Sequence, residues 1–453
     1  MTPSLAVVGR INEGKSSIVS TLAEDDSVEV SEHARTTTRC HRYPVRVDGE
    51  LLYTLVDTPG FGNAPRALRW MKERSRSADD RVETARAFVR EHREDPDFRD
   101  ECELLGPILE GAGILYVVDA SHPFTVDFEA EMEILQWTGR PRMALLNQIR
   151  ERDHGASWAR VLDQYFKHHV PFNAHAVGFA DRIEILKAFR LLQADWRAPL
   201  DRAVDEFQKD WERRRERAAA IIGGLIFDAL HWSAVVPQDP ATSPQAVAIR
   251  SLTELEARAR EAVERLYRHA RLKRAGGKDL SLEPGALFSR ETWKRQGLTL
   301  PQRLAAWAGA GATTGGAIDV GVGGASFFAG AVLGGAIGLG VGVWREKRGG
   351  FDFRARWLAK DRKEVTVGPV TDPEFPVVLF NRALGHYRLV RDRAHGRRDD
   401  LLLKDEDRPL SRLPDDLQRT LMKLFKELIR GGGSSALKTR LNQEVEKALL
   451  AKT

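Results

Sequence analysis

The residues best suited to chemistry are glycines, a lysine and a serine that directly follow a short apolar run. Gly9 and Gly14 enclose four residues, and Lys15 and Ser16 come next. Glycines let main-chain N–H groups close around phosphate oxygens, the lysine reaches β- and γ-phosphates, and the serine hydroxyl suits Mg²⁺. The spacing predicts a phosphate-binding loop. The residues expected to contact the nucleotide there are Gly9, Asn12, Glu13, Gly14, Lys15, Ser16 and Ser17.

A second group suited to metal binding ends a later apolar run. Leu51–Asp57 has the composition of a strand, and Asp57 is followed by Thr58, Pro59 and Gly60. A carboxylate at such a strand end supports Mg²⁺ through water, and the glycine amide senses a γ-phosphate. We expect Ser16 and Asp57 to share one Mg²⁺ ion.

The elements that must position these residues alternate between strand and helix. Leu5–Val8, Gly113–Asp119 and Met143–Asn147 are continuous apolar runs, each followed by a helical pattern. Such runs are typical of a parallel sheet that helices cover on both faces. We therefore expect an α/β, doubly wound domain over residues 1–200, with nucleotide at the carboxyl ends of its strands.

Residues 61–111 interrupt this alternation with a charged, mostly helical insert. Helices are expected over Met71–Arg93 and Phe98–Leu109. The insert is either a solvated helix pair or a surface for an effector or for dimerisation.

The motifs at residues 9–17, 37–39 and 57–60 resemble the Era-like branch of the translation-factor class of P-loop GTPases. This branch includes ribosome-assembly and tRNA-modification GTPases. The resemblance implies GTP and Mg²⁺ as cofactors, with Thr38, or else Thr37, closing over the metal as a switch. It implies slow intrinsic hydrolysis, because Phe61 stands where a water-orienting glutamine is found in other members. The residues it assigns to hydrolysis are Lys15, Asn12, Thr38 and Gly60, and those it assigns to Mg²⁺ are Ser16, Thr38 and Asp57.

Two further roles follow from the same resemblance. Asn12 is expected either to help hold K⁺ beside the phosphates or to stabilise the loop. Asn147 is expected to contact guanine. The sequence Asn147-Gln148-Ile149-Arg150 lacks the aspartate that normally accepts the guanine N–H groups. Guanine selectivity thus rests on the resemblance, unless a rearranged loop brings Glu151 or Asp153 into that place.

Residues 201–453 lose the alternation and are expected to be mainly helical. Two short segments, 365–367 and 376–380, are expected to be strands or buried connections. The expected helices are Leu200–Arg217, Ala218–Ala234, Ala246–Leu272, Leu413–Ile429 and Ser435–Leu450.

Residues 304–344 form a glycine-rich apolar stretch inside this half. Gly330, Gly334, Gly338 and Gly342 recur at four-residue intervals, which lets a second helix approach closely. Val320–Trp344 has no charged residue and is long enough to span a bilayer as a helix. The stretch is either a membrane hairpin, with basic residues up to 348 near headgroups, or a tightly packed soluble helix pair.

Composition sets broader limits. The chain has 453 residues, a net charge of +5, 42% hydrophobic and 30% charged residues, as in a soluble globular protein. No nucleic-acid-binding module is indicated. The two cysteines, Cys40 and Cys102, fit a reducing cytosol. We expect a cytoplasmic location. If the glycine-rich stretch is a membrane hairpin, the protein is peripheral to, or inserted in, a bacterial inner membrane. The histidines have no partners at metal-ligand spacing and are expected to be structural, namely His168, His169, His386 and His395.

The function expected from these features is that of a GTP-binding, Mg²⁺-dependent switch. Hydrolysis would couple nucleotide state to association with a membrane surface or a membrane-protein partner through residues 304–348. A dynamin-like assembly protein with a nucleotide-dependent dimer is one alternative. A ribosome-assembly or RNA-assembly GTPase is the other.

Overall fold

The computed structural model describes most of the chain as two compact units. The first contains Met1–Arg213, Arg268–Leu272 and Asp392–Asp399, and the second contains Arg214–Tyr267, Lys273–Arg391 and Asp400–Thr453. The described residues are 2–28, 37–148, 154–173, 178–237, 243–269, 272, 286–288, 292–293, 296–297, 341–343, 353–357, 364–397, 401, 408–431 and 433–451.

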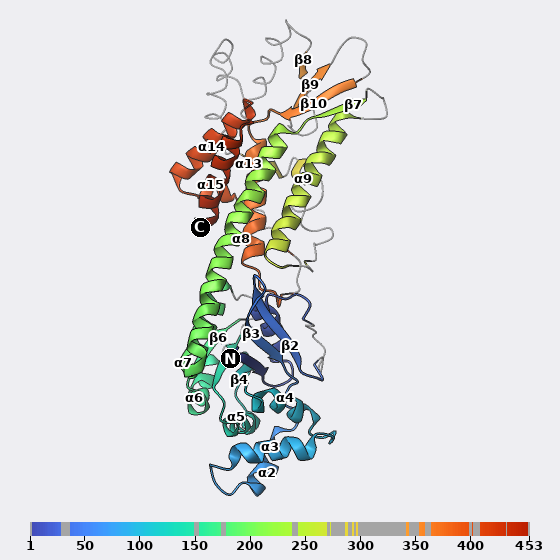
Figure 1. The fold of residues 1–453 in the computed structure, drawn as a ribbon. Coiled ribbons are helices and arrows are strands. Elements are labelled where there is room, and N and C mark those ends of the chain that lie inside the picture. The colour runs from blue at the N-terminus through green and yellow to red at the C-terminus, as the bar shows by residue number, and fades with distance from the viewer. Residues whose placement is uncertain are drawn as a thin grey trace. The chain divides into compact units, whose positions relative to one another are not determined.

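The first unit is built on a six-stranded sheet with the order β2-β3-β1-β4-β5-β6. Figure 1 labels four of these strands, β2, β3, β4 and β6. Only β2 runs antiparallel to its neighbour, and the other pairs are parallel. The register places Val7 beside Asp57 and Asp119 beside Asn147, so these strand ends meet at one edge. The predicted α/β fold class is confirmed. The strands are β1 (Ser4–Val8), β2 (His41–Val47), β3 (Glu50–Asp57), β4 (Gly113–Asp119), β5 (Arg142–Asn147) and β6 (His169–Phe172).

Helices cover both faces of this sheet, and β1 shows how the sequence specifies the two faces. Leu5 and Val7 belong to one buried cluster, while Ala6 and Val8 belong to the other. Side chains of a strand alternate between faces, so an all-apolar strand needs cover on both. α1, α7 and the start of α8 cover the first face, and α2 to α6 the second. The helices are α1 (Lys15–Ala23), α2 (Ala64–Arg74), α3 (Arg81–His92), α4 (Arg99–Leu109), α5 (Asp127–Trp137), α6 (Gly155–Tyr165), α7 (Phe179–Leu192) and the 3₁₀ turn η1 (Ala194–Trp196).

The predicted insert is helical, but the expected helix Met71–Arg93 is wrong as one element. α2 ends at Arg74 and α3 begins at Arg81. Asp80 holds the turn between them, because its carboxylate accepts hydrogen bonds from the Ser75 hydroxyl (2.6 Å) and the Arg76 N–H (2.8 Å). Such a side chain offers the backbone an alternative to helical hydrogen bonds.

α8 (Arg197–His231) is one continuous helix of 35 residues. The sequence predicted two helices that meet at Arg217 and Ala218, and this division is wrong. A change from charged to apolar composition does not end a helix, because termination needs a cap or a proline.

The second unit combines helices with a four-stranded antiparallel sheet of order β7-β10-β9-β8. The segment 376–380 lies in α13 rather than in a strand or a connection. α13 is buried almost all round, so its sequence shows no helical periodicity. The elements are β7 (Ala234–Pro237), α9 (Pro244–Leu266), η2 (Ala286–Phe288), β8 (Val341–Val343), β9 (Phe353–Trp357), β10 (Glu364–Val370), α13 (Phe375–Arg391), η3 (Pro409–Arg412), α14 (Asp415–Ile429) and α15 (Ser435–Leu450).

The predicted glycine-rich hairpin, residues 304–344, lies outside the described residues except at Val341–Val343. These three form strand β8, paired with β9, so the expected helix over Val320–Trp344 does not extend over them. Among the helices that the structure describes, none combines the length and the apolar character needed to cross a membrane.

Candidate nucleotide site

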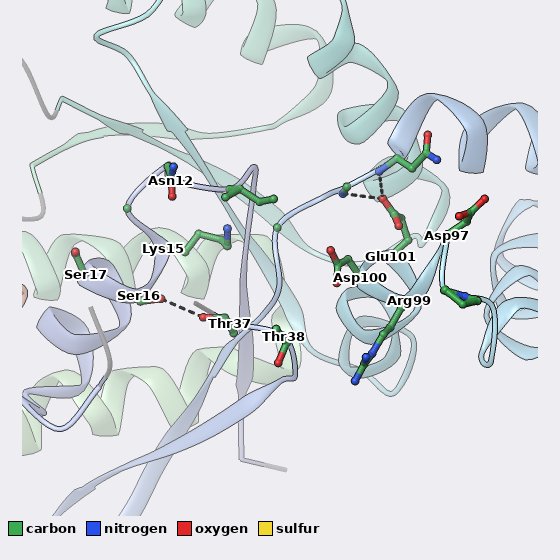
Figure 2. Close-up of a pocket in the computed structure, with 16 residues that line it drawn as sticks. Asn12, Lys15, Ser16, Ser17, Thr37, Thr38, Asp97, Arg99, Asp100 and Glu101 are labelled. Carbon is green, nitrogen blue, oxygen red and sulfur yellow. Dashed lines mark hydrogen bonds between the residues drawn. The ribbon is translucent and has the colours of Figure 1, made fainter. Parts of the chain in front are cut away.

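A cavity of about 570 Å³ lies at the carboxyl edge of the first unit's sheet (Figure 2). It is bordered by the loop between β1 and α1, by Thr37 and Thr38, by the segment after β3 and by the start of α4. Seven of the residues predicted from the sequence line it together, namely Asn12, Gly14, Lys15, Ser16, Ser17, Thr38 and Gly60. The predicted Gly9, Glu13, Asp57 and Asn147 do not line it. Gly9 and Glu13 belong to the loop between β1 and α1, Asp57 accepts a hydrogen bond from Ser16, and Asn147 donates one to Glu13.

The loop between β1 and α1 has the backbone that the glycine spacing predicts. Gly9 has a φ of +150° and Gly14, just before α1, has a φ of +84°. A Cβ on Gly9 would lie 2.3 Å from the carbonyl oxygen of Val117, so only glycine fits there. Asn12 has a φ of 69°, a left-handed conformation that asparagine tolerates. The strand–loop–helix arrangement therefore suits an anion at the start of α1.

The Lys15 side chain is buried in this loop. Its ammonium donates a hydrogen bond of 2.7 Å to the carbonyl oxygen of Arg10. Burial lowers the pKa of Lys15, although the carboxylates of Asp57 and Glu13 oppose this shift. A buried cation gains most from an anionic partner, which a phosphate would provide.

Three side-chain oxygens gather at the foot of the loop. The Ser16 hydroxyl donates to Oδ2 of Asp57 at 2.9 Å, the Thr37 hydroxyl lies 3.3 Å from the same oxygen, and the two hydroxyls are 3.5 Å apart. Asp57 is 2% exposed, and in the described part of the chain its buried Oδ1 has no hydrogen-bond partner. Burial raises the pKa of Asp57. A hard cation such as Mg²⁺, which prefers oxygen ligands, fits this group.

The structure places Thr37, not Thr38, beside Ser16 and Asp57. Thr38 lines the cavity and is exposed. Of the two threonines that the resemblance left open, Thr37 is the one that contacts Ser16 and Asp57.

The segment after β3 packs tightly against the phosphate loop. Thr58 donates its hydroxyl hydrogen bond to the carbonyl of Val7 at 2.8 Å, and the Phe61 N–H donates to the carbonyl of Gly9 at 3.3 Å. A Cβ on Gly60 would lie 2.6 Å from the N atom of Ile11. The Phe61 side chain belongs to the buried core, so its ring points away from the cavity.

The insert contributes residues that the sequence analysis missed. Oε1 of Glu101, in α4, accepts hydrogen bonds from the N–H groups of Gly62 (2.9 Å) and Asn63 (2.5 Å). Burial raises the pKa of Glu101. Asp97, Arg99 and Asp100 line the cavity beside it. Only the charged composition of the insert hinted at such residues, because the contact joins positions 39 residues apart.

Asn147 supports the loop rather than lining the cavity. It is fully buried, and its amide donates to the carbonyl of Glu13 at 3.0 Å. The Glu13 carboxylate accepts a hydrogen bond from the N–H of Asp119. Burial raises the pKa of Glu13 to about 7, against the lowering effect of that hydrogen bond. The positions considered for reading guanine, 149–153, lie outside the described residues.

Two protein families match different parts of the chain. A family described as "Domain of unknown function (DUF3482)" matches residues 160–452. A family described as "50S ribosome-binding GTPase" matches residues 4–148, which contain all the residues of the site. The N-terminal part is thus a P-loop GTPase domain of the Era type.

Individual proteins resemble the N-terminal part. GTPase Era from Acidimicrobium ferrooxidans is 44% identical over 81 residues, which are 17% of this chain and 28% of that protein. The match therefore spans little more than a quarter of the length of this curated relative. A crystal structure of an Aquifex aeolicus Era variant bound to GDP and AlF₄⁻ has 16% identity and a TM-score of 0.28, covering 58% of this chain and 89% of its own. An S. thermophilus NFeoB variant with the same ligand has 16% identity and a TM-score of 0.23, covering 59% and 89%. Structural likeness at this level carries no functional argument.

Proposed function

We propose that this chain, which belongs to the DUF3482 family and begins with an Era-type P-loop GTPase domain, binds GTP. It hydrolyses GTP with Mg²⁺ and acts as a molecular switch. Lys15 and the loop amides would hold the phosphates. Ser16 and Thr37 would ligate Mg²⁺, and Asp57 would support the metal through water. The metal supplies charge stabilisation at the transferred phosphoryl group.

One observation carries this proposal. Side-chain oxygens of Ser16, Thr37 and Asp57 come from three separate segments, and each lies within 3.5 Å of the other two. The buried Lys15 belongs to the same loop as Ser16. A buried carboxylate with an unpartnered oxygen costs free energy unless a ligand satisfies it. A magnesium–phosphate group satisfies both charges at once.

Calorimetry with GTP and ATP, each with Mg²⁺, tests the nucleotide. We expect GTP to bind with a Kd of about 1 µM or lower and ATP at least about tenfold more weakly. Lys15→Ala should abolish binding. Lys72→Ala is the matched control, because this exposed lysine pairs with Glu133 at 2.7 Å and does not line the cavity. Equal binding of GTP and ATP contradicts the guanine part of the proposal, and binding of neither contradicts all of it.

Phosphate release measured in KCl and in NaCl tests the role of Asn12. If Asn12 helps to hold K⁺ beside the phosphates, hydrolysis is faster in KCl and Asn12→Ala removes the difference. Equal rates in the two salts leave Asn12 with its loop-stabilising role, which its positive φ of 69° already supports.

A switch also needs a partner whose binding depends on the bound nucleotide. We propose that GTP controls association with a membrane or a protein partner through residues 304–348, on the ground of their glycine-rich apolar sequence. Co-sedimentation with anionic liposomes in GTP and GDP tests it. Binding that is the same in both nucleotides, or absent in both, contradicts the membrane version.

A ribosomal partner is the second candidate, and the description of the family that matches residues 4–148 favours it. Co-sedimentation with 50S particles only in the GTP state supports this candidate. Absence of the protein from the particle fractions in both states removes it.

A further inference from the structure

Asp26, His269 and His395 lie together within the first unit, although they come from three segments far apart in the sequence. One possible ligand atom from each residue lies within 4.8 Å of the others. Nδ1 of His395 is 2.7 Å, and Nδ1 of His269 is 3.7 Å, from Oδ1 of Asp26. None of the three side chains is more than 7% exposed. We propose that these side chains bind a divalent transition-metal ion, with Zn²⁺ the best match.

The donor set decides the class of ion. Two imidazole nitrogens and one carboxylate oxygen suit Zn²⁺, whereas Mg²⁺ and Ca²⁺ prefer oxygen ligands alone. Tetrahedral Zn²⁺ with bonds of about 2.0–2.1 Å holds its ligand atoms roughly 3.3 Å apart. The observed separations from Oδ1 of Asp26, 2.7 and 3.7 Å, lie on either side of this value. Small side-chain adjustments would therefore bring these three ligands into place, and a water molecule would supply the fourth.

Asp26 and His395 influence each other's protonation. Burial lowers the pKa of His395, and this outweighs the opposite effect of its hydrogen bond to Asp26. Burial alone would raise the pKa of Asp26, but hydrogen bonds with both histidines lower it overall. Metal binding would replace the hydrogen bond between Nδ1 of His395 and Asp26, because a ring nitrogen that ligates a metal carries no proton.

Contacts outside the group fix the segment that carries His395. The N–H of the next residue, Gly396, donates to the Thr21 hydroxyl at 3.0 Å. A Cβ on Gly396 would lie 2.6 Å from the carbonyl oxygen of Ser17, so this backbone packs directly on the first turn of α1. His395 is therefore held in place independently of Asp26.

The segment that carries His269 has anchors of its own. Nη1 of Arg268 lies 3.5 Å from Oε2 of Glu24, and Nη2 donates to the carbonyl of Arg46 at 3.3 Å. Arg268 has a φ of 62°, which is uncommon for a residue with a Cβ and indicates an imposed conformation. The rings of His269 and His395 stack with centroids 4.1 Å apart. Both imidazoles are thus pre-positioned on one side of Asp26.

The site has a consequence for the fold of the first unit. Asp26 follows α1, the helix that begins with Lys15, while His269 and His395 come from the DUF3482 match. A bound ion would join these segments to the helix of the phosphate loop. The zinc site does not depend on the proposed GTPase activity, since its residues differ from those that would hold the nucleotide.

Metal titration of the full-length protein tests the proposal. The chelator-treated protein is first saturated with GDP and Mg²⁺, so that the group around Ser16 and Asp57 is occupied. Zn²⁺ is then titrated against a chromophoric chelator. We expect one equivalent with a Kd of about 1 µM or lower. His269→Gln and His395→Gln should each weaken binding by at least about tenfold. His386→Gln is the matched control, because His386 is equally buried but pairs with Glu264 in the second unit.

Co²⁺ titration of the wild-type protein gives a second measurement that does not depend on whether the variants fold. Visible absorption bands of four-coordinate Co²⁺, displaced by one equivalent of Zn²⁺, support the site. A wild-type protein that binds no Zn²⁺, or Zn²⁺ affinity unchanged in both histidine variants, overturns the proposal. Asp26, His269 and His395 are then a hydrogen-bonded group without a metal.

Discussion

The Asn147 side-chain amide donates a hydrogen bond of 3.0 Å to the carbonyl oxygen of Glu13, so the end of β5 holds the phosphate loop directly. Asn147→Ala would leave a loop carbonyl without this partner. We expect a loss of about 1–3 kcal/mol in the free energy of unfolding, because a buried acceptor without a partner costs this much. GTP affinity, measured by calorimetry, should fall about tenfold as the loop loosens.

Asn381→Ala is the control for this prediction. Asn381 is also a buried asparagine, whose amide donates to the carbonyl of Gln296 at 2.7 Å in the second unit. Its loss should reduce stability without changing GTP affinity. If Asn147→Ala binds GTP as the wild type does, the bond from Asn147 to Glu13 does not organise the loop.

The pH dependence of stability should carry a contribution from Glu131. This carboxyl is 1% exposed and lies 2.5 Å from Nε of Arg10, and the Tyr116 hydroxyl donates to it at 3.0 Å. Burial raises its pKa from 4.5 to about 7, although Arg10 opposes the shift. The folded state then binds more protons than the unfolded state between these values. Its stability should therefore fall as pH rises from about 4.5 to 7, by roughly 3 kcal/mol at most.

Urea unfolding at several pH values measures this contribution. Glu131→Gln should make the decline between pH 5 and 7 smaller, with Glu13 supplying part of the remainder. Glu129→Gln, at an exposed position of the same helix, should leave the decline unchanged. A decline that is identical in wild type and Glu131→Gln assigns the pH dependence to other groups.

Gly60 and Gly62 both line the cavity and offer a matched pair of substitutions. A Cβ on Gly60 would lie 2.6 Å from the backbone N of Ile11, but a Cβ on Gly62 would lie 3.4 Å from its nearest neighbour, Oδ2 of Asp100. Gly60→Ala should cost about 1–3 kcal/mol of stability and weaken GTP binding, because the loop backbone must move. Gly62→Ala should change stability by less than about 0.5 kcal/mol. Equal thermal stability of the two variants would show that the loop tolerates the shift.

Helices and strands with clear hydrophobic periodicity and clear end signals could be predicted from the sequence. The expected strand Gly113–Asp119 and the expected helix Ser435–Leu450 are the observed β4 and α15. Both are bounded by clear signals, an aspartate at the end of β4 and a serine before α15. α13 was missed because a helix buried on nearly all sides has the same apolar sequence as a buried strand.

The site residues also differ in how far they could be predicted from the sequence. The phosphate loop follows from the spacing of Gly9, Gly14 and Lys15, because each residue's role depends on its immediate neighbours. Glu101 and His395 were not predicted as partners of other groups. Glu101 reaches Gly62 across 39 positions, and His395 reaches Asp26 across 369. Such contacts depend on the packing of whole elements, which a single sequence does not display.

The last prediction separates Thr37 from Thr38. In the structure, the Thr37 hydroxyl lies 3.3 Å from Oδ2 of Asp57 and 3.5 Å from the Ser16 hydroxyl, while Thr38 is exposed. Thr37→Ala should raise the Mg²⁺ concentration needed for half-maximal hydrolysis by about tenfold or more, since even a hydrogen bond to a charged group contributes about 1.5–3 kcal/mol. Thr38→Ala should change it less than about twofold. Phosphate release at a series of Mg²⁺ concentrations measures both, and equal GDP affinity in the two variants serves as the control for folding. The reverse order would mean that GTP moves residues 37–38 until Thr38 reaches the metal, as the sequence resemblance implies.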